Sequence, residues 1–275
     1  MRQYAKPTLP PLPVEPDGLA PPSASLQHPG QCQALTASRW PARLDLLQGI
    51  SGLALALFLV AHMAFVASIL VSEEMFYRVA RFFEGEWLFG TPHPWLVSLV
   101  AAGVTGLLIV HAWLALRKFP ASYRQHSAFA AHRRRLRHVD TSLWWLQVVS
   151  GFILFFLTTI HLYDMLSQPA LIGPYESADR VWSGRMWPIY LALLFTAEVH
   201  GGIGLYRLAL KWGWFVGSEP NRGRLRLRRV RHVFTAFFVS LGLVTLLAYV
   251  DLGRNHAAHA GERYQPPPSA EPTRS

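Results

Sequence analysis

The sequence predicts an all-α membrane protein in which five helices cross the bilayer, and two observations support this fold class. Of the 275 residues, 51% are hydrophobic and only 15% are charged, whereas soluble domains average about 25% charged residues. Five apolar runs each supply the roughly 20 helical residues that cross a hydrocarbon layer of about 30 Å. We expect a five-helix membrane domain at residues 39–253, preceded by a disordered or loosely docked tail at 1–38 and followed by a disordered tail at 254–275.

Each apolar run has the composition of a membrane-spanning helix. The first, GISGLALALFLVAHMAFVASILVS, contains no Asp, Glu, Lys or Arg, and neither does the second. The third has one acid near its end, the fourth has one acid in its middle, and the fifth is charged only near its ends. Tryptophans gather near the ends of the runs, as in an interfacial aromatic belt. The expected helices are residues 44–72, 95–116, 141–166, 187–212 and 230–251. No internal repeat is apparent.

The positions of the basic residues predict the orientation of the helices. Arg and Lys concentrate between the second and third runs and between the fourth and fifth, while the other two connections hold few. Basic segments stay on the cytoplasmic side of a membrane, so we expect a cytoplasmic N-terminus and a periplasmic C-terminus. This arrangement accounts for the net charge of +10 without a nucleic-acid partner.

Cysteine chemistry and a cleaved leader are not expected. Cys32 is the single cysteine of the chain, so it has no partner for an internal disulfide. The Cys-x-x-Cys-His sequence that attaches c-type haem is absent, and no cysteine cluster could hold an iron–sulfur centre or structural zinc. Residues 1–39 contain no apolar run of the kind found in a secretory signal peptide.

Four consecutive apolar runs each contain one histidine at depth. A single histidine in a membrane helix is more often a hydrogen-bonding residue, but one in each of four helices predicts paired axial ligands for haem iron. His62 and His161 fall late in helices that run outward, so both are expected near the outer side. His111 is expected near the cytoplasm, and His200, whose depth is ambiguous, is left to pair with it. Two b haems at different depths follow from this arrangement.

Three polar side chains are candidates to contact the propionates of the inner haem. Lys211 follows His200 by three helical turns and lies on the same face of its helix. Gln48 precedes His62 in the first apolar helix and lies on nearly the same face as that histidine. Trp144 could donate its indole N–H at the same level. The structural alternatives are snorkelling for Lys211 and interfacial anchoring for Trp144.

Carboxylates at two places in the sequence are candidates for proton handling. Glu198 lies within the fourth run, about 200° around the helix from His200, and membrane carboxylates are usually paired or on a proton route. Glu84 and Glu86 lie in an outer connection beside aromatic residues, where a carboxylate could accept protons from a quinol. Most acids in such connections are simply solvated.

Long stretches of the chain resemble a known family. They are LALRKFPASYRQ, HVDTSLWWLQ, the run Gly151–Leu162 and EVHGGIGLYRLALKWGWF. They resemble the dihaem cytochrome b anchor of bacterial menaquinol:fumarate reductases, within the succinate:quinone oxidoreductase superfamily, over about two-thirds of the chain from Ala42 to Gly217. The resemblance implies five helices in a bacterial inner membrane, the first four holding two b haems.

The resemblance also implies roles for individual residues. It carries menaquinol oxidation onto Glu84 and a transmembrane proton pathway onto Glu198. Gly49 departs from the family, in which a serine is expected at this position. The resemblance also implies haem ligation by the four histidines, which are His62, His111, His161 and His200. Propionate contact is implied for Gln48, Trp144 and Lys211.

The resemblance implies partners, and the residues alone leave other functions open. The expected partners are a flavoprotein that interconverts fumarate and succinate and an iron–sulfur protein at the cytoplasmic face, in a dimeric complex of anaerobic respiration. The chain would oxidise menaquinol for fumarate reduction, or serve a succinate:quinone reductase that works in the opposite direction, and would conduct electrons with no dicarboxylate chemistry of its own. The alternatives are a dihaem cytochrome b of a hydrogenase or formate dehydrogenase, a haem-free transporter, and a purely structural anchor.

Overall fold

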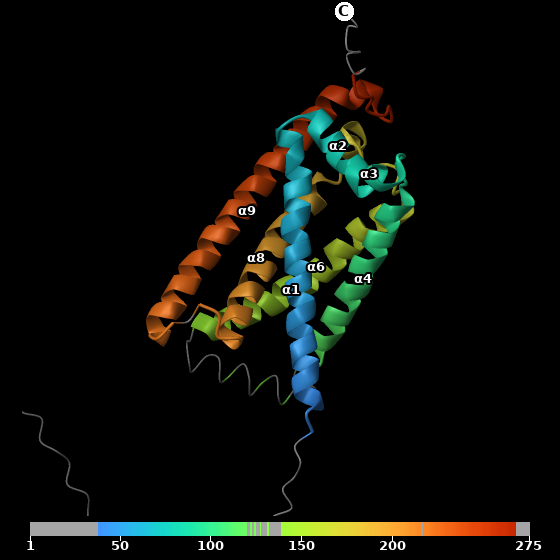
Figure 1. Ribbon diagram of the computed structural model, residues 1–275. Coiled ribbons are helices and arrows are strands. Elements are labelled where there is room, and N and C mark those ends of the chain that lie inside the picture. Colours follow the sequence, from blue (N-terminus) through green and yellow to red (C-terminus); the bar gives the residue numbers. More distant parts are fainter. Residues whose placement is uncertain are drawn as a thin grey trace, which may run out of the picture. The chain divides into compact units, whose positions relative to one another are not determined.

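The computed structural model describes residues 38–119, 139–215 and 217–267, together with 122, 124, 127 and 131. The expected N-terminal tail, with Cys32, lies outside these residues, apart from its last position. So do most of the basic connection after the second apolar run and the last residues of the expected C-terminal tail. The regular structure of the described residues is helical throughout, with no strand among them (Figure 1).

Five helices in the described ranges are long and apolar enough to cross a membrane, which confirms the predicted fold class. They are α1 (Trp40–Ala67), α4 (Trp95–Leu116), α6 (Val139–Ser167), α8 (Trp187–Lys211) and α9 (Pro220–His256). The short helices are α2 (Glu73–Phe83), α3 (Glu86–Phe89) and α7 (Pro174–Val181), with 3-10 turns at η1 (Ser68–Leu70) and η2 (Ala257–His259).

Two helices begin earlier than hydropathy predicts. α1 starts at Trp40 rather than Leu44, and α9 starts at Pro220 rather than Val230. Each has a proline in its first turn, where the missing N–H costs no hydrogen bond and the fixed φ suits the helix. Hydropathy detects only the apolar part of a helix. It therefore does not identify the arginine-rich first turns of α9 as helical.

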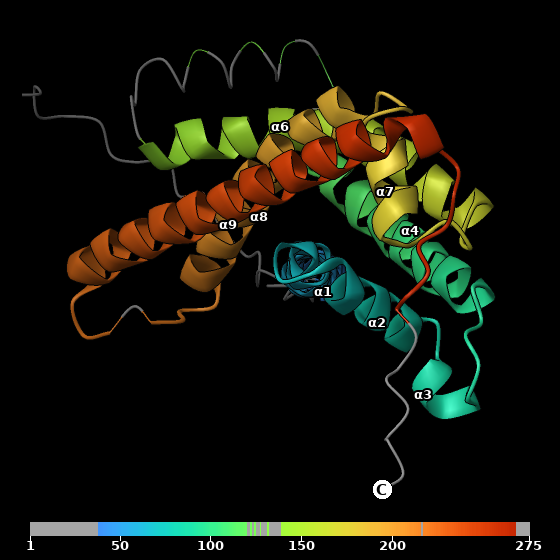
Figure 2. The same ribbon diagram turned by 90° about the horizontal axis from the view of Figure 1, so that it is seen from above.

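Side chains that face away from the bundle are apolar and exposed, as expected when lipid is the solvent. Leu57, Phe156 and Leu247 are 62%, 67% and 66% exposed. Inside the bundle, α1 packs against α4, α6 against α8, and α8 against α9. Figure 2, which looks nearly along α1, shows α6, α8 and α9 to one side of it and α2 and α3 to the other.

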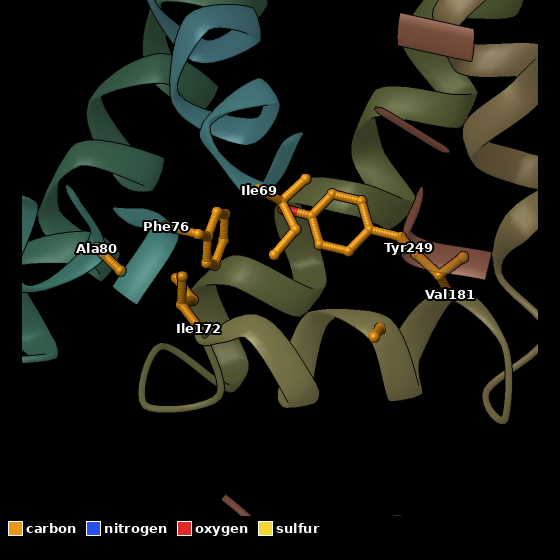
Figure 3. Packing of buried hydrophobic residues seen from close by; sticks show 7 residues of the cluster. Ile69, Phe76, Ala80, Ile172, Val181 and Tyr249 are labelled. Carbon is orange, nitrogen blue, oxygen red and sulfur yellow. The ribbon is translucent and has the colours of Figure 1, made fainter. Parts of the chain in front are cut away.

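A buried apolar cluster holds the short helices at the end of the bundle opposite the N-terminus of α1. Its side chains come from η1, α2, α7, α9 and the connection before α7 (Figure 3), and they are Ile69, Phe76, Ala80, Ile172, Ala178, Val181 and Tyr249. The Tyr249 hydroxyl also donates to the Val66 carbonyl at 3.2 Å. Helix α2 is capped by the Ser72 side chain, which accepts from the Met75 N–H at 3.0 Å. The cluster therefore fixes α2, whose last residue precedes Glu84.

Candidate functional site

A cavity of about 1400 Å³ lies between α1, α4, α6 and α8. Its volume exceeds the roughly 300–1,000 Å³ of a typical drug-sized pocket. All four membrane histidines lie on its wall, and the remaining wall is mainly aliphatic and aromatic. The cavity is therefore suited to a large apolar ligand that carries a few polar groups.

His62 and His161 form one pair, toward the C-terminal ends of α1 and α6. Their ring centroids are 5.9 Å apart, with the ring planes inclined by 54°. Phe58 stacks on His62 at 5.8 Å, and Tyr190 meets His161 edge-on at 5.6 Å. The Nδ1 atom of His161 is buried and makes no hydrogen bond with any residue that the structure describes. The structure thus brings together the two histidines that the sequence analysis pairs.

His111 and His200 form the second pair, with ring centroids 6.5 Å apart and planes inclined by 88°. The Nδ1 of His200 lies 2.9 Å from the carbonyl oxygen of Gln147. A carbonyl oxygen only accepts, so this Nδ1 carries the proton and the Nε2 lone pair is free for a metal. The Nδ1 of His111 lies 3.1 Å from the Ser51 hydroxyl, which itself donates to the Gln48 carbonyl. The same tautomer follows for His111.

A short sequence pattern occurs twice and builds both sides of this pair. Gln-x-x-Ser-Gly stands at 48–52 in α1 and at 147–151 in α6, each time ten residues before a cavity histidine. A Cβ on Gly52 would lie 2.9 Å from His111 Cε1, and one on Gly151 would lie 2.8 Å from His200 Cε1. The glycines admit the imidazole rings of the facing helices. The pattern is too short to count as an internal repeat of the chain, but it gives both histidines of this pair an equivalent facing backbone.

Each histidine pair could bind a metal ion whose other ligands come from a cofactor and not from the protein. Ring centroids about 6 Å apart leave room for one metal between two imidazole nitrogens, each about 2.0–2.1 Å from the metal. In the described ranges, no three His, Cys, Asp or Glu side chains are grouped to hold a metal by themselves. A planar macrocycle, as in haem, supplies the missing donors, and its apolar rim suits the cavity wall.

The mouth of the cavity near the N-terminal end of α1 carries a charged cluster, of which the sequence analysis identified only Lys211. Lys118 and Lys211 both form ion pairs with the Asp45 carboxylate, and Lys211 Nζ also donates to the Asp45 carbonyl at 3.0 Å. Gln48 and Trp144 line the same cavity, and the Gln48 amide oxygen is buried with no hydrogen bond to a described residue. Lys211, Gln48 and Trp144 thus all line the same cavity.

Gly49 has a packing reason for departing from the serine expected in the family. A Cβ at this position would lie 2.9 Å from Cζ2 of Trp212 and 3.2 Å from Leu208 Cδ1. The indole of Trp212 occupies the space that a serine side chain would need. No serine hydroxyl is therefore available at this point of the cavity mouth.

The two carboxylates that were singled out from the sequence are both buried, in different places. Glu198 lies on the cavity wall and also borders a small pocket between α1, α8 and α9. Its Oε1 makes no hydrogen bond within the described residues. Glu84 is fully buried just after α2, next to Phe83, which lines the cavity. Burial distinguishes Glu84 from Glu86, which is exposed as an ordinary solvated acid would be.

Known proteins match this chain at the level of sequence. Residues 123–243 match the model of the succinate dehydrogenase/fumarate reductase transmembrane subunit family. The fumarate reductase cytochrome b subunit of Wolinella succinogenes is 48% identical over 216 residues, which span 78% of this chain and 84% of that protein. The chain belongs to the fumarate reductase cytochrome b family.

A second relative within this family supports the same assignment. The fumarate reductase cytochrome b subunit of Helicobacter pylori is 48% identical over 224 residues, 82% of this chain and 86% of that protein. Membership confirms the resemblance found in the sequence. As a fumarate reductase cytochrome b subunit with five apolar helices, the chain is a multi-pass membrane anchor of the bacterial inner membrane and part of an oxidoreductase complex.

Proposed function

We propose that this subunit holds two b haems and oxidises menaquinol for a fumarate reductase. One haem would lie between His62 and His161 and the other between His111 and His200. The observation that supports this most strongly is the presence of two opposed imidazole pairs on the wall of one cavity, with centroids 5.9 and 6.5 Å apart. The relatives' name, cytochrome b, agrees with haem b as the cofactor.

The side chains of the cavity perform distinct tasks in this proposal. Bound haem b supplies a reversible one-electron redox couple. The Gln147 carbonyl and the Ser51 hydroxyl engage Nδ1 of His200 and His111, which would leave the Nε2 atoms of both residues to hold the haem iron. Lys211, Gln48 and Trp144 would contact propionates at the cytoplasmic mouth, with Lys118 adding a second positive charge.

Glu84 is proposed as the proton acceptor for menaquinol. Oxidation of one menaquinol to menaquinone releases two electrons and two protons. Glu84 accepts one proton, releases it to the outer aqueous phase and can then accept the other. Its neighbour in the chain, Phe83, lines the cavity, and the exposed rings of Phe82 and Trp87 stack with centroids 5.7 Å apart in the same connection, where a lipophilic substrate could approach.

The orientation and partners complete the proposal. The N-terminus is placed in the cytoplasm because the basic connections belong there. An iron–sulfur subunit would dock on the cytoplasmic face and pass electrons to a flavoprotein that reduces fumarate, in a dimeric complex. Glu198, buried beside the cavity, is proposed to carry a compensating proton through the membrane interior.

Haem counting in single histidine variants tests the proposal. The intact protein, purified in mild detergent, is expected to bind two haems per chain and to show b-type bands in a reduced-minus-oxidised spectrum. His62→Ala and His111→Ala should each lose one haem, because each removes an axial ligand of a different site. His259→Ala is the matched control, since this histidine is exposed beyond the end of α9.

Two results would contradict the proposal. A colourless preparation would indicate a haem-free transporter, and full haem content in both alanine variants would remove the ligand assignment. Copurification with hydrogenase or formate dehydrogenase subunits, instead of a flavoprotein and an iron–sulfur protein, would refute the fumarate reductase assignment.

A further inference from the structure

Arg81 makes the one close charge contact to Glu84 that the described residues provide. Its Nη1 lies 2.6 Å from Glu84 Oε2, three residues along the same helix. Glu84 is fully buried and the Arg81 side chain is only 18% exposed. An ion pair this well shielded from water interacts more strongly than a surface pair.

Both members of this pair are held in place. Arg81 Nη2 donates to the Ile172 carbonyl at 3.5 Å, and its guanidinium lies over the Tyr77 ring, 5.0 Å from the centroid. The Glu84 N–H donates to the Ala80 carbonyl at 3.0 Å, and the Glu84 carbonyl accepts from the His93 N–H at 2.8 Å. The chain can turn directly after Glu84 because the next residue is a glycine with φ of 78°.

Other charges around Glu84 come from three further segments. Burial raises the pKa of Glu84, and Arg81 opposes this as the nearest positive charge. Glu86 of α3 and Glu176 of α7 raise the pKa further, while Arg263 of the C-terminal segment lowers it. Without Arg81, a buried carboxyl beside two other acids would hold its proton at higher pH.

The Glu84 carboxylate also retains an unused acceptor. Neither of its oxygens has a hydrogen bond of acceptable geometry within the described residues. Arg81 pairs with Oε2, which leaves Oε1 to accept from an incoming hydroxyl group. A buried carboxylate with an unoccupied oxygen is costly, and a ligand that donates a hydrogen bond would relieve that cost.

We propose that Arg81 is a positioning residue that keeps Glu84 ionised and oriented until menaquinol binds. This inference rests on the proposed role of Glu84 as proton acceptor. During transfer, the O–H bond of the quinol breaks, a new O–H bond forms at Glu84, and the electrons leave to the redox chain. The positive charge of Arg81 then favours loss of that proton to the outer side, which readies Glu84 for the second one.

The experiment measures quinol oxidation by the intact fumarate reductase complex as a function of pH. A water-soluble dimethylnaphthoquinol serves as donor and fumarate as acceptor, while reduced viologen, which bypasses the quinol site, reports on the partner subunits. Arg81→Gln is expected to move the acidic limb of kcat/KM upward by about 1–3 pH units, since an opposite charge at this distance shifts a carboxyl pKa by that amount. Arg81→Lys should restore most of the wild-type profile.

Controls separate this effect from misfolding and from the proposed function itself. Arg78→Gln is the matched control, because Arg78 lies on the same helix but pairs with Glu74 at the surface. Haem content and viologen-driven activity must stay intact, and Arg81→Met replaces the glutamine variant if that one fails to assemble. An unchanged limb in the uncharged variants overturns the inference, provided that Glu84→Gln abolishes quinol oxidation. Full activity of Glu84→Gln would instead overturn the proposed role of Glu84.

Discussion

Two glycines determine how closely the inner histidines approach the facing helices. Gly151 of α6 lies against the His200 ring, and Gly52 of α1 lies against the His111 ring. Cβ atoms in proteins essentially never approach another heavy atom as closely as an added Cβ would at these two positions. The helix backbone cannot retreat without disturbing its packing, so the ring must move.

Gly151→Ala is therefore expected to displace His200 and to reduce haem content from two per chain to about one. The helix itself should persist, because alanine is the best helix former. Gly106→Ala in α4 is the control, since an added Cβ there meets nothing within 4 Å. Pyridine haemochrome analysis gives the haem count and circular dichroism gives the helix content. Two haems in the Gly151 variant would show that the close approach has no role in ligation.

Residues of the candidate site differ in how visible they are in the sequence. The histidines and Glu198 stand out because a polar group in lipid is costly. Asp45 does not, because its two lysine partners lie 73 and 166 residues further along the chain. Arg81 resembles any other basic residue near a helix end until the burial of Glu84 is known.

At the scale of elements, α7 connects the bundle to the segment that follows α9. Asp179 of α7 accepts from the Gly261 N–H at 2.8 Å, and its other oxygen lies 3.0 Å from His256 Nδ1. Tyr175 stacks on His256 with centroids 4.3 Å apart, and Tyr264 packs against Tyr175. Residues 257–264, expected from composition to be part of a disordered tail, thus have defined contacts.

Asp179→Ala is expected to release this segment. Losing a hydrogen bond to a charged group costs about 1.5–3 kcal/mol. The population in which residues 257–264 are detached from α7 should therefore rise roughly tenfold or more. Limited trypsin digestion measures this as faster cleavage after Arg263, followed by mass spectrometry. Glu262→Ala serves as control, because Glu262 contacts only the exposed His259 among the described residues. Equal cleavage rates in wild type and the Asp179 variant would contradict the role assigned to Asp179.

At the scale of the whole molecule, the two histidine pairs lie at different depths of the bundle. Moving a charge from one pair to the other across a membrane potential requires or releases electrical work, up to about 2.3 kcal/mol per charge per 100 mV for a full crossing. Glu198 is buried between the cavity and the small pocket beside α9. A proton carried there in the same direction as the electrons would offset that cost.

Glu198→Gln is expected to slow quinol-linked fumarate reduction roughly tenfold or more in membranes that hold a potential, because the electrical work is no longer offset. Haem content should remain two per chain, and fumarate reduction from reduced viologen should match wild type. Normal quinol-linked turnover in this variant would remove the proton role and leave Glu198 a structural residue.

Composition and local spacing are enough to predict the five membrane helices, the four histidines within them and the family. They suffice because lipid tolerates long apolar helices and penalises polar side chains within them. The folded chain was needed to see that Gly52 and Gly151 admit the imidazoles, that Asp45 joins two lysines, and that Arg81 faces a buried Glu84. These contacts depend on burial and on pairings between distant segments, and neither is encoded in the spacing along one helix.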